Sequence, residues 1–410
     1  MSSKSRALRK GAAIGASAGV VVGLAGALGA GTASAAPASP ARPMLAGTHT
    51  FNYTCTYPLI GKRPLKVAID TNIPEKLGVS QNTGKIQVSW TATLGDDTTS
   101  GLNAVDGASI EGSAEAKAQV VGPGYPNGVN VSTKNALQPT PIPSSGSFQI
   151  KGYGEAPGIS FDSAGQVTAK LGDMNLNVLL KKKDGTPGAL GTFKAPCTMD
   201  AGQDATVASG QVVDGDQTLP TPVTPPSYFP YTGAPVSPGQ LSYAFNLKGS
   251  SFIKSPNGTM PLDGSIGVKV DGATGAITGD LTLKKATGKM NILGFLPVDA
   301  TVDFAQVGQT VGTYANGEIK TTSTMYIKLP VMSLMGIPLG GGDQCQSSKP
   351  SAIDMFSTPG QFFDPKKGGP YKASNYVISD IVNCGPLNGI LSIFTAGSGN
   401  TIDANLTPSA

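Results

Sequence analysis

Charged and aromatic residues are scarce in this 410-residue chain, at 14% and 6%. No cluster of Lys and Arg supplies the basic surface that phosphates require, so we expect no nucleic-acid partner. Long helices are excluded as the main architecture, because 55 Gly and 32 Pro residues would interrupt them. Hydrophobic residues still make up 39%, which is enough to build a core, so global disorder is not expected.

Histidine is nearly absent, since His49 is the only one. A Ser-His-Asp esterase needs a histidine base beside its serine, and the single Gly-x-Ser-x-Gly motif falls at residues 15–19, inside the export signal described next. The four cysteines include no Cys-x-x-Cys pair, which disfavours a metal site. We therefore expect no metal and no cofactor. The sequence identifies no catalytic residue and leaves open whether the protein is an enzyme.

Residues 1–35 have the features of a secretory signal peptide. Four basic residues within the first ten positions precede an uncharged apolar segment, and Ala33-Ser34-Ala35 matches a small-residue cleavage site. Cleavage would leave 30 − 4 = 26 basic and 26 acidic residues, a formal net charge of zero. The sequence thus predicts a secreted extracellular protein, or one loosely associated with the cell wall, with no transmembrane anchor after signal cleavage.

Four cysteines in an exported chain are expected to form disulfides, and three connectivities are possible. A Pro-rich tract at residues 215–238 separates the first two cysteines from the last two. Because dense proline makes a stiff, extended linker, the tract favours one disulfide on either side of it. The favoured pairs are Cys55–Cys197 and Cys345–Cys384.

The sequence predicts an all-β protein with one domain on each side of this linker. In residues 44–214, short runs such as Phe51-x-Tyr53-x-Cys55 alternate with period two, which predicts a β-sandwich. Trp90, the single tryptophan, is expected in its core; stacking on a ligand is the alternative. In residues 239–410, successive turn signals predict an antiparallel meander that curls into a barrel or half-barrel, with one short helix at 388–396.

Three segments of the second domain are rich in Met, Leu, Ile and Phe, at residues 290–298, 329–339 and 387–394. At the mouth of a barrel such segments suit a flat or long apolar ligand, lipid or sterol-like, because Met adapts its shape. The alternative is that they fill the barrel as core. The candidate ligand-binding residues are Met290, Ile292, Phe295, Leu296, Met332, Leu334, Met335, Ile337, Ile390 and Phe394.

Both domains resemble parts of exported actinobacterial proteins. The strings at 50–61 and 184–198 contain Cys55 and Cys197 in the frames of a β-rich domain of unknown function, over about residues 47–205. Three strings of the second domain are similar to a group in which some members are labelled cholesterol esterase. The first resemblance implies no activity, and the second implies hydrolysis of sterol or lipid esters. The three strings are 291–297, 337–342 and 394–402.

Three functions stay open at this point. The first is a non-enzymatic, two-domain binding or cell-surface module whose partner is an apolar small molecule or a component of the cell envelope. The second is an extracellular ester hydrolase, which rests on resemblance alone. The third is a structural or adhesive envelope protein that associates through sheet edges. The sequence does not indicate an oligomeric state.

Overall fold

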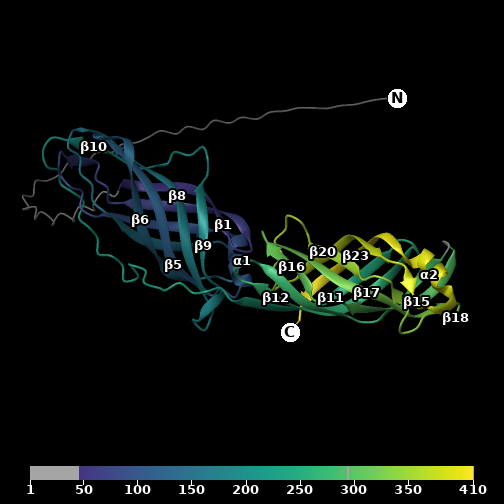
Figure 1. Cartoon of the computed structure of the whole chain (residues 1–410). Helices are drawn as coiled ribbons and strands as arrows, with labels where there is room; N and C mark the ends of the chain where they lie inside the picture. Colours follow the sequence, from purple (N-terminus) through teal and green to yellow (C-terminus); the bar gives the residue numbers. More distant parts are fainter. Residues whose placement is uncertain (1–45, 293–294, 410) are drawn as a thin grey trace, which may run out of the picture. The chain divides into compact units, whose positions relative to one another are not determined.

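The computed structural model describes residues 46–292 and 295–409, and it is all-β with two sheet-built bodies, as the sequence predicts (Figure 1). The predicted signal peptide at 1–35 lies outside the described residues. Within those residues, no helix combines the length and the apolar character that crossing a membrane would take.

The first body contains ten strands and one helix among the described residues. Its elements are β1 (Ala46–Tyr57), β2 (Gly61–Thr71), β3 (Lys76–Gly78), β4 (Ile86–Leu94), α1 (Asp96–Ala104), β5 (Ser109–Gly122), β6 (Tyr125–Pro141), β7 (Phe148–Ala156), β8 (Gly165–Lys181), β9 (Pro187–Met199) and β10 (Thr206–Val213). On β1 the alternating side chains from Phe51 to Tyr57 are all buried, so the period-two pattern reports the inner face correctly.

Eight of these strands close into one antiparallel sheet. The order is β8-β5-β6-β7-β4-β2-β1-β9, and β9 pairs with β8 to complete the ring. β10 extends the sheet beyond β8, and β3 pairs with β10 in parallel. The body that the sequence predicts as a sandwich is therefore a single continuous sheet, whose opposite halves face each other across the core.

Helix α1, which joins β4 to β5, was not predicted from the sequence. Its residues include Thr, Ser, Gly and Asn, which are poor helix formers, and no side chain caps its N-terminus. The negative charges of Asp96 and Asp97 in the first turn interact favourably with the positive end of the helix dipole. Leu102 and Ala104 are buried, and Gly101 lies so close to Ile60 that a side chain there would clash. Packing, rather than intrinsic propensity, explains this helix.

The second body is a second closed sheet with additional elements. Its ring strands are β11 (Gln240–Ile253), β12 (Gly258–Asp271), β13 (Ala276–Leu283), β16 (Thr310–Ala315), β17 (Glu318–Leu334), β20 (Ser351–Ser357), β21 (Gly369–Ile378) and β23 (Gly397–Pro408). The additional elements are β14 (Ala286–Ile292), β15 (Leu296–Gln306), β18 (Ile337–Gly340), β19 (Gln346–Ser347), β22 (Ile381–Val382), the 3-10 turn η1 (Gly385–Leu387) and α2 (Asn388–Thr395).

Ring closure in this body follows the chain order. β11, β12, β13, β16 and β17 are successive neighbours; β20, β21 and β23 continue the sheet, and β23 pairs with β11. The β17–β20 pairing completes the ring. This topology is the predicted meander, and α2 is the short helix predicted at 388–396. The hairpins β14–β15 and β17–β18 extend the sheet at one end of the body, beside α2 (Figure 1).

Both predicted disulfides are present. Cys55 bonds to Cys197, directly opposite it on the paired strands β1 and β9. Cys345 bonds to Cys384, which immediately precedes η1. Each disulfide closes a loop within one body, and the described residues contain no free cysteine.

The chain between β10 and β11 forms no strand or helix, in agreement with its proline content. It nevertheless makes specific contacts with the first body. The side chain of Gln87 accepts a hydrogen bond from Val223 N and donates one to Val223 O, both at 2.7 Å. The ring of Phe229 packs edge-on against Tyr153. These contacts hold part of the tract along the outer face of β4 and β7.

Candidate functional site

The ten predicted ligand-binding residues divide into a buried and a projecting group. Met290 and Met332 belong to the core, and Met290 lines a cavity of about 30 Å³. Leu296, Leu334 and Phe394 are half-buried and pack against that core. Ile292 lies on β14 and pairs with Leu296. The projecting residues are Phe295, Met335, Ile337 and Ile390.

The projecting residues form an apolar surface that we call the apolar end. Phe295 is 74% exposed, Met335 77% and Ile337 67%. Helix α2 contributes Ile390 and also Ile393, which is 70% exposed and was not among the predicted residues. Large apolar side chains with most of their surface in water are unfavourable in an isolated soluble protein, and a group of them marks an interaction surface.

Hydrogen bonds connect the segments that form the apolar end. Asn291 N donates to Pro256 O at 2.9 Å, which joins β14 to the β11–β12 turn. Ser255 Oγ in the same turn donates to Ile393 O at 3.1 Å, which joins that turn to α2. The β17–β18 hairpin pairs with β15 through Val298 and Leu334. Side chains from three distant parts of the chain are thus held at one end.

The tip of the β17–β18 hairpin combines exposure with backbone strain. Leu334 pairs with Ile337, so Met335 and Gly336 form a two-residue turn. Their φ angles are +48° and +83°, the left-handed region that this tight turn requires. Asn-Gly is the favoured pair for such a turn, whereas Met has a Cβ that crowds the left-handed backbone. A Met in this position is unfavourable both for the turn and for solubility.

The segments that supply the apolar end contain no charged residue. Asp, Glu, Lys and Arg are absent from residues 290–298, 329–342 and 381–402. The nearest charges in sequence, such as Lys289 and Asp299, lie where β14 and β15 continue into the body. Lys254, which is exposed, precedes Ser255 in the β11–β12 turn that bonds to α2, so the apolar side chains can lose their water while this ammonium group stays at the polar boundary.

The second disulfide fixes α2 in place. Cys345 O accepts a hydrogen bond from Leu329 N at 2.9 Å, which attaches this cysteine to β17. Cys384 N donates to Asn388 Oδ1, the first residue of α2, at 2.6 Å. The Cys345–Cys384 bond therefore ties the start of the helix to the strand that carries Met335 at its tip.

His49 lies on β1 and is half-buried, with its ring stacked on Phe51 at 6.4 Å between centroids. Within the described residues the ring makes no hydrogen bond, so no oriented Ser–His pair forms there. The described residues also contain no group of three His, Cys, Asp or Glu side chains placed to hold a metal ion.

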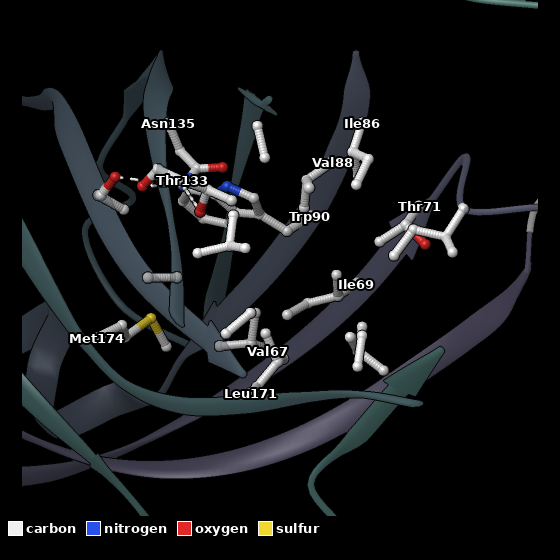
Figure 2. A pocket seen from close by; sticks show the side chains of 18 of the residues that line it. Val67, Ile69, Thr71, Ile86, Val88, Trp90, Thr133, Asn135, Leu171 and Met174 are labelled. Carbon is white, nitrogen blue, oxygen red and sulfur yellow. Dashed lines mark hydrogen bonds between the residues drawn. The ribbon is translucent and has the colours of Figure 1, made fainter. Parts of the chain in front are cut away.

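Sequence reasoning missed a cavity inside the first body (Figure 2). Its volume is about 80 Å³, and its walls come from inward-facing side chains of β2, β4, β5, β6, β7, β8 and β10. Trp90 forms part of this wall, so the predicted core residue also faces open space. A smaller cavity of about 40 Å³ shares Ile73, Ile86, Val120 and Ala169 with it.

Two polar atoms in this apolar wall have no hydrogen-bond partner. Asn135 and Thr71 are 4% and 3% exposed, and neither Asn135 Oδ1 nor Thr71 Oγ1 is paired. The amide nitrogen of Asn135 donates to Thr133 Oγ1 at 3.0 Å. Figure 2 shows Asn135 beside Thr133 on one side of the cavity and Thr71 on the other. Unpaired buried polar atoms are rare in folded proteins, so these two call for an explanation.

A sequence signal for this cavity does exist in the small residues of two inner faces. Ala114, Ala116 and Ala118 alternate along β5, and Gly152 and Gly154 alternate along β7. A side chain at Gly152 would overlap Trp90, and one at Gly154 would overlap Asn135. The alanines of β5 line the cavity, whereas Trp90 and Asn135 fill the space beside the two glycines, and only the assembled sheet shows which small residues leave space open.

Comparison with known families adds a match in the first body. Residues 52–208 match a family of unknown function, DUF6801, in agreement with the resemblance of the first domain to such a domain. The matched segment contains every residue that lines the 80 Å³ cavity. No curated protein and no solved structure gave a significant match.

Proposed function

We propose that this protein is an exported, non-enzymatic binding module that attaches to a lipid surface of the cell envelope through the apolar end. The observation that carries the proposal is the outward projection of Phe295, Met335 and Ile393 from three separate segments. The signal-like residues 1–35 and the two disulfides support export. The partners predicted from the sequence are an apolar small molecule and a component of the cell envelope. Of these, a lipid surface best fits apolar side chains that project outward.

The chemistry of the apolar end favours lipid over a protein partner. Protein interfaces usually surround their apolar centre with polar and charged groups that form hydrogen bonds. Here the segment 329–342 and the segment 381–402 contain no charge at all. A hairpin tip and a short helix that carry Met, Phe and Ile can enter the acyl region beneath lipid headgroups, where a charged side chain would be costly.

Vesicle flotation tests this function. The purified protein, with both disulfides intact, is mixed with phosphatidylcholine vesicles, and the fraction that floats with the lipid is measured at low and high salt. We expect co-flotation with little salt dependence, because hydrophobic insertion, unlike adsorption of basic segments, does not depend on screened charges. Failure of the wild-type protein to float with lipid would refute the proposal.

Matched variants locate the lipid contact. The double variant Phe295→Ser/Ile393→Ser removes two projecting side chains without touching the core, and we expect partitioning to fall roughly tenfold or more. Val311→Ser is the control, because Val311 is also exposed but lies on β16 opposite Thr322, outside the apolar end. An equal loss in both variants would show that general surface hydrophobicity, and not the apolar end, controls binding.

A further inference from the structure

We propose that the outer face of the first body is a recognition site for extended Pro-rich segments, and that the tract at 215–238 occupies this site in cis. The proposal concerns the first body and the tract, and it does not depend on lipid attachment. The observation that carries it is a pair of glutamine side chains, Gln81 and Gln87, each of which binds the backbone of one tract residue.

The two glutamines bind the tract in the same way. Gln81 Oε1 accepts a hydrogen bond from Gln217 N at 3.0 Å, and Gln81 Nε2 donates to Gln217 O at 2.7 Å. The amide of Gln87 makes the same two bonds with Val223, both at 2.7 Å. Because one amide binds both the N–H and the C=O of a single residue, the site recognises backbone rather than side chain. The side chain of Val223 is accordingly 51% exposed.

The spacing of the contacts matches the geometry of a Pro-rich segment. Dense proline favours the polyproline II helix, which has three residues per turn, so positions six residues apart lie on the same side of it. Gln217, Val223 and Phe229 are spaced six residues apart. Phe229 makes the third contact, since its ring centroid lies 5.1 Å from that of Tyr153. In this geometry the tract presents one side to the body at all three contacts.

Hydrogen bonds within the first body orient the two glutamine amides. Gln87 is 6% exposed, and its Nε2 also donates to Tyr153 Oη at 2.6 Å. Tyr153 Oη in turn donates to Glu155 Oε1 at 3.1 Å. Gln81 Oε1 also accepts a hydrogen bond from Gly78 N at 2.8 Å. Groups that are already oriented lose less conformational entropy when a segment binds, which favours recognition by this face.

The contacts define the class of peptide that fits. Proline has no N–H, so the two positions that the glutamines bind must be occupied by other residues. The tract meets this requirement, because its prolines at 220, 222, 225 and 226 leave Gln217 and Val223 free to donate. A second segment of this class must displace the tract, whose local concentration at the site is on the order of millimolar because it belongs to the same chain.

Binding of a peptide in trans tests the site. In a full-length chain with Gly-Ser repeats in place of residues 215–232, the site is vacant, and the probe is a fluorescein-labelled peptide with the sequence of those residues. By fluorescence anisotropy we expect saturable binding that is at least roughly tenfold tighter than binding to the wild-type chain, whose own tract competes. Absence of saturable binding to the vacated chain would overturn the proposal.

Two substituted peptides assign the binding to the glutamine contacts. Val223→Pro removes the N–H that Gln87 binds, and we expect the affinity to fall roughly tenfold. Thr221→Pro is the control, because Thr221 is exposed and makes no hydrogen bond with any other described residue. It should bind like the unchanged peptide. Equal weakening by the two substitutions would contradict recognition of the backbone at 223.

Hydrogen exchange gives a second measurement, which decides the question if the vacated chain does not fold. In the wild-type chain, Val223 N–H is bound, whereas Thr224 N–H has no partner among the described residues. We expect NMR to show at least roughly tenfold slower exchange at Val223, corrected for intrinsic rates, and Gln87→Leu to remove this protection. Gln149→Leu, at an exposed glutamine of β7, should retain it. Equal exchange of the two amides in wild type would refute the site.

Discussion

The two closed sheets of this protein show how the same architecture gives different properties when the inner side chains differ. The first sheet places Ala at alternate inner positions of β5, and it encloses a cavity of about 80 Å³. The second places Met, Leu and Tyr inside, and its cavities are about 20 Å³ to about 30 Å³ each. The distinguishing feature of the first body is an internal cavity, whereas the second body projects apolar side chains from one end.

The hydrogen bonding of buried polar side chains also differs between the two bodies. In the second body, Ser251 and Tyr376 share a hydrogen bond of 2.7 Å, as do Thr310 and Ser323, although Ser351 Oγ is left unpaired. In the first body, Asn135 Oδ1 and Thr71 Oγ1 are buried and unpaired, and both residues belong to the wall of the cavity. Paired hydroxyls stabilise the interior of the second body, whereas each unpaired buried atom lowers the stability of the body that contains it.

Removal of one disulfide at a time should have the largest effect on stability, and it tests whether the two bodies unfold independently. The loop-entropy model gives upper values of about 5 kcal/mol for Cys55–Cys197 and about 4 kcal/mol for Cys345–Cys384. We expect Cys55→Ala/Cys197→Ala to lower the urea midpoint of the Trp90 fluorescence transition strongly. Cys345→Ala/Cys384→Ala should leave that transition unchanged and weaken vesicle binding, because α2 loses its attachment. A shift of the Trp90 transition in the second variant would mean that the bodies unfold as one unit.

Adding the same side chain to each interior tests the difference in packing. Ala114 faces the cavity of the first body, whereas Ala300 is completely buried on β15 of the second. We expect Ala300→Leu to destabilise by about 1–3 kcal/mol through overpacking, and Ala114→Leu to change stability by less than about 1 kcal/mol. Urea unfolding followed by far-UV circular dichroism measures both. A larger loss for Ala114→Leu would show that the first interior is less open than its cavity indicates.

The features that could be predicted from the sequence are those set by local patterns or by chain order. Period-two alternation identified strands such as β1, and the position of the Pro-rich tract identified both disulfide pairs, because these are local patterns or follow from chain order. Closure of the first sheet depends on the β8–β9 and β1–β9 pairings together, which no local pattern specifies. The predicted apolar residues separated into core and surface because those on β14 and β17, such as Met290 and Met332, face the interior, whereas the projecting ones lie in turns, on β18 or on α2.

Alkaline pH provides a smaller test, directed at the filled interior. Burial raises the pKa of Tyr376 from its ordinary value of 10.0 to about 12. Since the folded state favours the neutral phenol, its contribution to stability is present below pH 10 and is lost as the pH rises towards 12. Tyr376→Phe should cost about 1 kcal/mol near neutral pH, because Ser251 loses its partner. The variant should then lose less stability than wild type between about pH 9 and about pH 11. Parallel losses in urea titrations would contradict this assignment.

Met335→Asn is the smallest change and the sharpest test of the projecting end. Asn tolerates the left-handed φ of +48° better than Met does, so the variant should be more stable by up to about 1 kcal/mol. Vesicle binding should fall at the same time, because the most exposed apolar side chain of the apolar end is lost. The opposite signs separate function from folding, since a purely structural Met335 would give higher stability with unchanged flotation. Gly336→Ala provides the control: Gly336 has a φ of +83°, so its substitution should destabilise the turn while Met335 is retained.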